Sequence, residues 1–296
     1  KRQHMKVMNT TNSLVLAIFI IVITILVSIN NRTINSTIVT IEKGMSLNTV
    51  AQLLYTKNVI VSQDIFKAKV VLRGLASKIP TGKFLFEGQV SDSAIIDFIF
   101  NDGPIKLKLT IPEGLQSDQV FENINALLDT EYDFKKYFNS KEVIQDFNIT
   151  GKSLEGYLYP DTYYLYHDSS PGEIIEILLS EFWKQFDKNL IDRTNQLGFS
   201  VHQVVTLASI IEGEAMLSSE RKTISSVYHN RLKINMKLQA DPTIQYIIPG
   251  PPKTLSIRDL RIKSEYNTYQ NYGLPPGPIN NPCLLYTSPS PRDTPI

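Results

Sequence analysis

The chain has 296 residues, a length that allows two domains of modest size. Hydrophobic residues make up 42% of it, which is ordinary for folded protein. The formal net charge is +1, from 30 basic and 29 acidic residues, and this balance argues against a nucleic-acid-binding surface. Cys283 is the single cysteine, so the sequence excludes an internal disulfide, and the fold must be stable through its core alone.

An uncharged apolar run at 13–29, SLVLAIFIIVITILVSI, is the first predicted element. At about 1.5 Å per residue, this run and its flanks cross a hydrocarbon core of roughly 30 Å. Basic residues within 1–12 put the N-terminus in the cytoplasm by the positive-inside rule. We therefore expect an uncleaved anchor and a single-pass protein of the inner (cytoplasmic) membrane, with an extracytoplasmic remainder.

Two alternatives to the anchor are weaker. A cleaved signal peptide needs a small-x-small cleavage site after the apolar run, and none follows it. A buried core helix would carry its apolar residues along one stripe, whereas here they run all round the helix.

Residues 38–110 predict a small α+β module. Ser46 precedes apolar residues at helical spacing, so 38–60 is predicted as strand, turn and helix. Alternation of apolar and charged residues predicts a half-buried strand over 105–114. Between these segments the sequence predicts a helix over 62–73, a turn and strand over 79–88, and a short capped helix over 91–103.

Residues 111–282 predict a larger, mixed α+β domain. An amphipathic helix is expected over 170–190, a strongly apolar one over 202–215, and a capped one over 219–235. The predicted fold class of the whole chain is thus α+β, with a transmembrane helix, a small α+β module and a mixed α+β domain in that order.

Two glutamates stand at the end of the apolar helix, and a helical wheel separates them. With Ile211 at zero, Glu214 falls at about −60°, inside the apolar arc, and Glu212 at about 100°, on its flank. The wheel predicts that Glu214 points toward low dielectric, where a carboxyl keeps its proton to higher pH. Protonating a glycosidic oxygen near neutral pH requires such an acid. The alternative is a structural ion pair between Glu214 and Arg221 or Arg231.

Five motifs carry a resemblance to a known family. In chain order they are EGYLYPDTYYL at 155–165, ASIIEGEA at 208–215, SERKTISSVYHNRL at 219–232, MKLQADPTIQY at 236–246 and YNTYQNYGLPPGPINNP at 266–282. Together they resemble the endolytic murein transglycosylases of the MltG/YceG-like type. The resemblance covers roughly 38–282, and it implies a LysM-like module over 38–110 followed by the catalytic domain over 111–282.

The resemblance implies an activity as well. It is lytic cleavage of the MurNAc-GlcNAc β-1,4 bond within nascent peptidoglycan strands, leaving 1,6-anhydroMurNAc ends, by a membrane-anchored enzyme. The catalytic acid maps onto the second glutamate of the motif, Glu214. Because the muramyl 6-hydroxyl attacks its own anomeric carbon, one glutamate can serve as acid and then as base. The candidate substrate-binding residues are Glu212, Asn230, Gln239, Asp241, Tyr266 and Asn267.

No cofactor or metal is expected. The chain has four His residues, without an HExxH motif or paired ligand spacing. The implied partners are peptidoglycan glycan strands, the membrane and, through the family, peptidoglycan synthases or elongation and division proteins; no nucleic acid is expected.

The sequence also departs from the family. Family members continue past 282, so we expect a catalytic domain that is incomplete at its C-terminus and a non-native tail over 283–296. Position 213 is Gly, where Lys or another residue is common in the family, and Gly weakens a helix by roughly 1 kcal/mol relative to Ala.

Several alternatives stay open from the sequence. The chain could be a non-catalytic, membrane-anchored protein that binds peptidoglycan or the division machinery. It could also be a hydrolytic muramidase with Asp161 or Asp241 as a second carboxylate. Glu220 and Arg221 are expected to form a structural ion pair. Three tyrosines could stack on sugars, but aromatics at this spacing are more often part of a core: Tyr157, Tyr159 and Tyr163.

Overall fold

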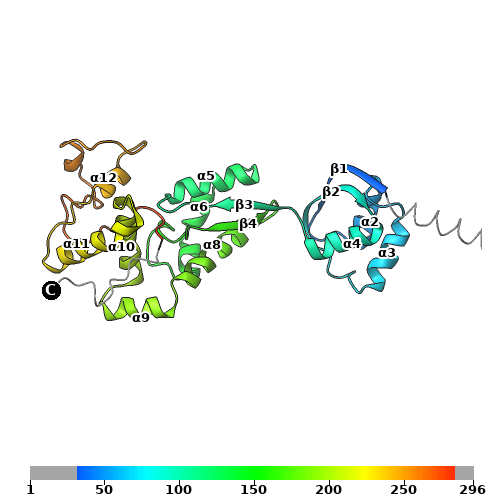
Figure 1. Cartoon of the computed structure of the whole chain (residues 1–296), viewed down its shortest axis with the longest axis horizontal. Coiled ribbons are helices and arrows are strands. Elements are labelled where there is room, and N and C mark those ends of the chain that lie inside the picture. Colours follow the sequence, from blue (N-terminus) through cyan, green and yellow to red (C-terminus); the bar gives the residue numbers. More distant parts are fainter. Residues whose placement is uncertain (1–31, 284–296) are drawn as a thin grey trace, which may run out of the picture. The chain divides into compact units, whose positions relative to one another are not determined.

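The computed structural model of the chain describes residues 32–283, which form two compact units (Figure 1). One unit ends at Leu107 and includes Tyr166–Asp168, and the other comprises Lys108–Leu165 and the residues from Ser169 onward. Helices and short two-stranded sheets make up the described fold, which is therefore mixed α+β.

The transmembrane part of the expected fold class has to be corrected. The predicted span at 13–29 lies outside the described residues. Within 32–283, no helix combines the length and the apolar character needed to cross a membrane. The longest of these helices, α8 (Pro171–Gln185), has 15 residues, whereas a bilayer core requires about 20. The described fold is thus α+β without a membrane-spanning helix, and the expected single-pass localisation is withdrawn with it.

The first unit is built on an antiparallel pair of strands, β1 (Arg32–Ile41) and β2 (Gly82–Val90), with a bulge between Ile34 and Thr37. Ser46 caps the following helix as expected, since its hydroxyl accepts a hydrogen bond from the Thr49 amide. The helices are α2 (Leu47–Thr56), α3 (Gln63–Leu72), α4 (Asp92–Asp97) and the π-helical η1 (Phe98–Asp102). Their apolar faces and the strands enclose one core. The LysM-like assignment of this region stays a prediction.

The second unit is mostly helical. It holds most of the sheet that pairs β3 (Lys106–Thr110) with β4 (Thr162–Tyr166). The remaining elements are α5 (Ser117–Leu128), α6 (Phe134–Phe138), α7 (Lys141–Asp146), α8, α9 (Lys188–Gln196), α10 (Val201–Glu214), η2 (Ser218–Glu220), α11 (Arg221–Lys233), α12 (Asp241–Ile247) and η3 (Asp259–Arg261).

Helix α10 is the central helix of this unit. A capping box of Ser200 and Gln203 starts it, and every residue from Val205 to Ile211 is buried. Helices α11 and α12 pack against it, together with the segment around Ile279. Because α10 is buried all round along these seven residues, only its two ends reach solvent, and Glu214 lies at the C-terminal end.

Candidate active site

The last turn of α10 opens into a cleft of about 390 Å³ in the second unit. Four segments distant in sequence form its walls: the stretch between β3 and α5, the end of α10, helix α12 with the loop that follows it, and the stretch around Ile279. The cleft is lined by Gly114, Gln116, Gly213, Glu214, Asp241, Pro242, Gln245, Tyr246, Pro252, Ile279 and Asn280. Amides and carboxylates thus face a space large enough for sugar rings.

Glu214 is the last residue of α10 and lines this cleft as an exposed residue. Its carboxylate accepts a hydrogen bond from the Tyr228 hydroxyl of α11. Partial desolvation of the carboxyl, followed by the negative charge of Asp241, raises the pKa of Glu214, while Tyr228 and Arg231 act in the opposite direction. The net effect favours the protonated acid at the cleft surface.

Glu212 is the more deeply buried of the two glutamates, so the orientation predicted by the wheel is wrong. Its side chain is 7% exposed and pairs with Arg221 at 2.5 Å, and Arg221 also binds Glu113 at 2.6 Å. The Cys283 amide donates to the other oxygen of Glu212 at 3.3 Å. The wheel failed because α10 has no single inward face; neighbouring segments decide which glutamate is covered.

Asp241 opens helix α12 and lines the same cleft as Glu214. The Tyr269 hydroxyl donates a hydrogen bond of 2.5 Å to its Oδ1 atom. Burial and this bond raise the pKa of Tyr269 to about 12, so the phenol remains a donor at neutral pH. Asp241 is therefore tied to Tyr269 and lines the same cleft as Glu214.

Gly213 and Pro242 bring these two walls together. A Cβ atom on Gly213 would lie 2.8 Å from Cβ of Pro242 and 3.4 Å from Nδ2 of Asn280. Real side chains do not approach that closely, so α12 packs against bare backbone of α10 at this point. Gly213 belongs to α10, and no bend separates it from Glu214.

The other predicted binding residues lie in different places. Gln239 is exposed, has a left-handed φ of 50° and is not among the residues that line the cleft. Asn230 is exposed on α11 and is not among the residues that line the cleft. Tyr266 packs its ring against Tyr246 with centroids 5.0 Å apart. Asn267 is fully buried, and its amide binds backbone groups of its own loop, including the Ile262 carbonyl at 2.6 Å.

A buried polar cluster behind the cleft was not predicted from the sequence. Asn281 is completely buried; its Oδ1 accepts from the amides of Gly156 and Leu158, and its Nδ2 donates to the Leu115 carbonyl. Glu155, which is 7% exposed, accepts from the Ser117 amide at 3.0 Å and the Ser117 hydroxyl at 3.1 Å. The neighbours of these residues along the chain line the cleft, so the cluster fixes its wall. The sequence signal that could have identified this cluster is the position of Glu155 and Asn281 within the motifs 155–165 and 266–282.

Two further expectations are resolved by the structure. Arg221 pairs with Glu212 and Glu113, and the Glu220 carboxylate accepts from the amides of Met216 and Leu217 and closes the turn before α11. The three tyrosines of the 155–165 motif are at most 7% exposed, which places them in the core: Tyr157, Tyr159 and Tyr163.

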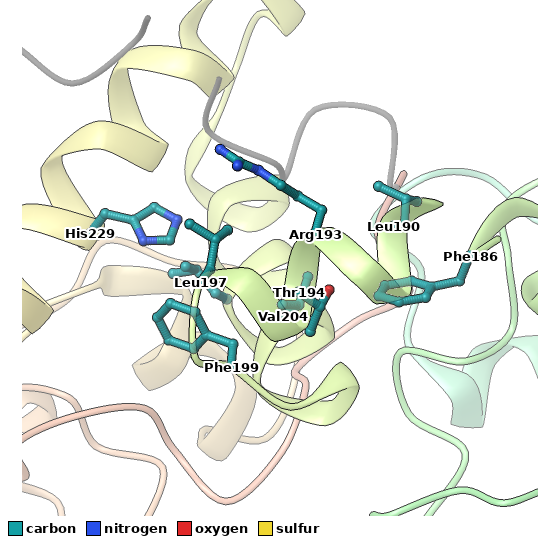
Figure 2. A pocket seen from close by; sticks show the side chains of 9 residues that line it. Phe186, Leu190, Arg193, Thr194, Leu197, Phe199, Val204 and His229 are labelled. Atoms are coloured by element: carbon teal, nitrogen blue, oxygen red, sulfur yellow. The ribbon is translucent and has the colours of Figure 1, made fainter. Parts of the chain in front are cut away.

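A smaller cavity of about 20 Å³ lies among α9, α10 and α11, away from the carboxylates (Figure 2). Its walls are mostly apolar, and the His229 ring meets Phe199 edge to face at 5.7 Å. Such a space holds about one water molecule, and neither Asp nor Glu lines it.

Among residues 32–283, no three His, Cys, Asp or Glu side chains are grouped so as to hold a metal ion. The chemistry is therefore assigned to the larger cleft.

Comparison with known proteins agrees with this geometry. The model of the YceG-like family matches residues 39–284. The chain belongs to the YceG-like family. This YceG-like chain is 33% identical over 260 residues to the endolytic murein transglycosylase of Bacillus subtilis (strain 168), an alignment that covers 82% of the chain and 72% of that protein.

Two further relatives support the assignment. The endolytic murein transglycosylase of Streptococcus pneumoniae serotype 2 is 30% identical over 213 residues, and the YceG-like chain spans only 37% of its length. A crystal structure of a YceG-like protein from Listeria monocytogenes superposes with a TM-score of 0.58 at 30% identity, covering 86% of this chain and 90% of that one. The family predicted from the five motifs is confirmed, and so is the enzyme class, because the relatives from Bacillus and Streptococcus are named murein transglycosylases.

Proposed function

We propose that this protein is an endolytic lytic transglycosylase that cleaves the MurNAc-GlcNAc β-1,4 bond within peptidoglycan strands, with Glu214 as acid and then base. The observation that carries the proposal is the position of Glu214, whose carboxyl lines an open cleft with a raised pKa. Peptidoglycan as the substrate class follows from the named relatives, which are murein transglycosylases.

The reaction needs one proton donor that is regenerated. Protonated Glu214 gives its proton to the glycosidic oxygen, and the bond between that oxygen and the muramyl anomeric carbon breaks. The muramyl 6-hydroxyl oxygen then bonds to the anomeric carbon and closes the 1,6-anhydro ring. Its proton returns to the Glu214 carboxylate, so atoms and charge balance without a water molecule.

The cleft supplies groups that suit this substrate. Gln116, Gln245 and Asn280 present amides, and Tyr246 contributes an aromatic ring to the wall. Amides bind sugar hydroxyls as donors and acceptors, and aromatic rings pack against sugar faces. These residues would hold the strand while the bond to the leaving oxygen breaks. Glu212 is left out of this set because Arg221 and the Cys283 amide occupy its carboxylate.

Digestion of purified peptidoglycan tests the proposal. The unmodified protein should release fragments with anhydro-muramyl ends, detected by mass spectrometry, and Glu214→Gln should lower their rate by at least a hundredfold. Glu176→Gln removes an exposed carboxyl on α8 and is the matched control, which should retain full activity. Thermal denaturation of each variant verifies that it is folded.

Three results would contradict the proposal in different ways. Binding to peptidoglycan without any product would favour the non-catalytic alternative. Fragments heavier by one water would identify a hydrolase, because only hydrolysis adds water across the bond. Undiminished activity of Glu214→Gln would show that another residue supplies the proton.

A further inference from the structure

We propose that Asp241 is a positioning residue that acts through Glu214: held by Tyr269, its fixed negative charge favours the protonated form of Glu214, and it does not serve as the second carboxylate of a hydrolase. This inference rests on the proposed function of the cleft. It assigns Asp241 a role other than the sugar binding predicted from the sequence.

The first argument is the packing that brings the two carboxylates to one cleft. Gly213 and Pro242 meet so closely that a Cβ atom on Gly213 would lie 2.8 Å from the proline ring. Glu214 follows Gly213 on α10, and Asp241 precedes Pro242 at the start of α12. Both acidic residues line the same cleft as this contact.

The second argument is the anchoring of Asp241 to one loop. The chain reaches Asp241 through Gln239, in the left-handed conformation, whose amide donates to the Thr268 carbonyl at 3.1 Å. The Ala240 amide donates to the Thr268 hydroxyl at 2.9 Å. Tyr269, the next residue of that loop, donates to Asp241 itself at 2.5 Å. The backbone of the two residues before Asp241 and the Asp241 side chain are thus bonded to the same segment.

The third argument concerns the charge state of Asp241. A hydroxyl that donates to a carboxylate stabilises its ionised form and makes it a weaker base. A hydrolase instead needs a second carboxylate that accepts a proton from water or attacks the sugar. The bond from Tyr269 occupies one oxygen of the Asp241 carboxylate and fixes its position, which suits a positioning residue.

The charged and titratable groups near Glu214 show how the charge of Asp241 acts on it. Tyr228 and Arg231 act on it from α11 and Asp241 from α12, and Tyr269 donates a hydrogen bond to Asp241. Arg231 also donates to the Leu238 carbonyl, which ties it to the chain before α12. Of these groups Asp241 carries the negative charge, and a like charge in a partly desolvated cleft opposes ionisation of Glu214.

The test is the pH dependence of anhydro-muramyl product formation by the full chain, measured at low concentrations of purified peptidoglycan. Asp241→Asn removes the charge, keeps the size and leaves an oxygen to accept from Tyr269. We expect the basic limb of its pH profile to move to lower pH, with activity approaching that of the unmodified protein at acidic pH. Tyr269→Phe keeps the charge but removes the anchor, and should give a smaller shift in the same direction.

Asp192→Asn, an exposed carboxylate on α9, is the matched control and should leave the profile unchanged. An unmoved basic limb in folded Asp241→Asn would overturn the inference, as would an equal loss of rate at every pH. The inference would also be overturned if Asp241→Asn lost products that carry an added water and kept the anhydro products, because this would identify Asp241 as a hydrolytic carboxylate. Activity of Glu214→Gln reports separately on the proposed function, so failures of the two can be told apart.

Discussion

Replacing Glu155 with Gln removes a carboxyl that ionises inside the protein, and we expect it to change how stability depends on pH. Glu155 is 7% exposed and is surrounded by the segments that form the cleft wall. Burial raises its pKa from 4.5 to about 7, although the Ser117 amide and hydroxyl oppose the rise. Gln keeps an oxygen for both Ser117 bonds and cannot ionise.

The sign and size follow from linkage. A carboxyl whose pKa is raised in the folded state stabilises the fold fully below the unfolded pKa, and this stability is lost as pH rises through the folded pKa. A rise from 4.5 to about 7 corresponds to about 3 kcal/mol at full ionisation. About 2.5 kcal/mol of this falls between pH 5 and pH 8.

Urea unfolding at several pH values measures the effect. Trp183 on α8 is the single tryptophan of the chain, so its fluorescence reports on the unit that contains Glu155. We expect the unmodified protein to lose about 2.5 kcal/mol more than Glu155→Gln on going from pH 5 to pH 8. Glu176→Gln, at an exposed position, should behave like the unmodified protein. Parallel pH curves for the unmodified protein and Glu155→Gln would refute the reasoning.

Three other predictions concern residues that hold the site together. Arg221→Met should cost about 3–5 kcal/mol in urea unfolding, because Glu212 stays buried with its cationic partner removed, and adding Glu212→Leu should recover most of the loss; a loss below about 1 kcal/mol would contradict this. Asn281→Ala should lower the free energy of unfolding by about 3 kcal/mol or more, since it leaves two buried amides and a carbonyl without their partner. The control Asn189→Ala on α9 should be nearly neutral, and equal stabilities of the two variants would count against the role of Asn281. Burial lowers the pKa of His229, so its folded neutral form makes the protein lose stability as pH falls below about 6.5. His229→Gln should flatten that acid limb, measured by Trp183 fluorescence, and an unchanged limb would show that the ring is protonated without cost.

Local patterns determined most of the secondary structure of this protein. The helix predicted over 62–73 is α3 at Gln63–Leu72, and the one predicted over 202–215 is α10 at Val201–Glu214. Caps and apolar periodicity lie within a few residues of the element they define, so they can be read directly from the sequence. The order of the five motifs was specific enough to indicate the family, which the family model confirmed.

Tertiary structure decided which glutamate faces the cleft. The wheel assumed that α10 has one apolar arc, but the helix is buried all round from Val205 to Ile211. Arg221 pairs with Glu212 and also with Glu113, which is far away in sequence, while Glu214 stands where the helix ends. The apolar periodicity of α10 does not indicate where those partners lie in the fold.

Long-range contacts also built the rest of the site. Asp241 is held by Tyr269, and Asn281 joins backbone groups near residues 115 and 156. The sequence alone determined that a carboxyl acid lies at the end of an apolar helix in this family's motif. Which carboxyl is free to give its proton depended on hydrogen bonds and burial from segments brought together only by folding.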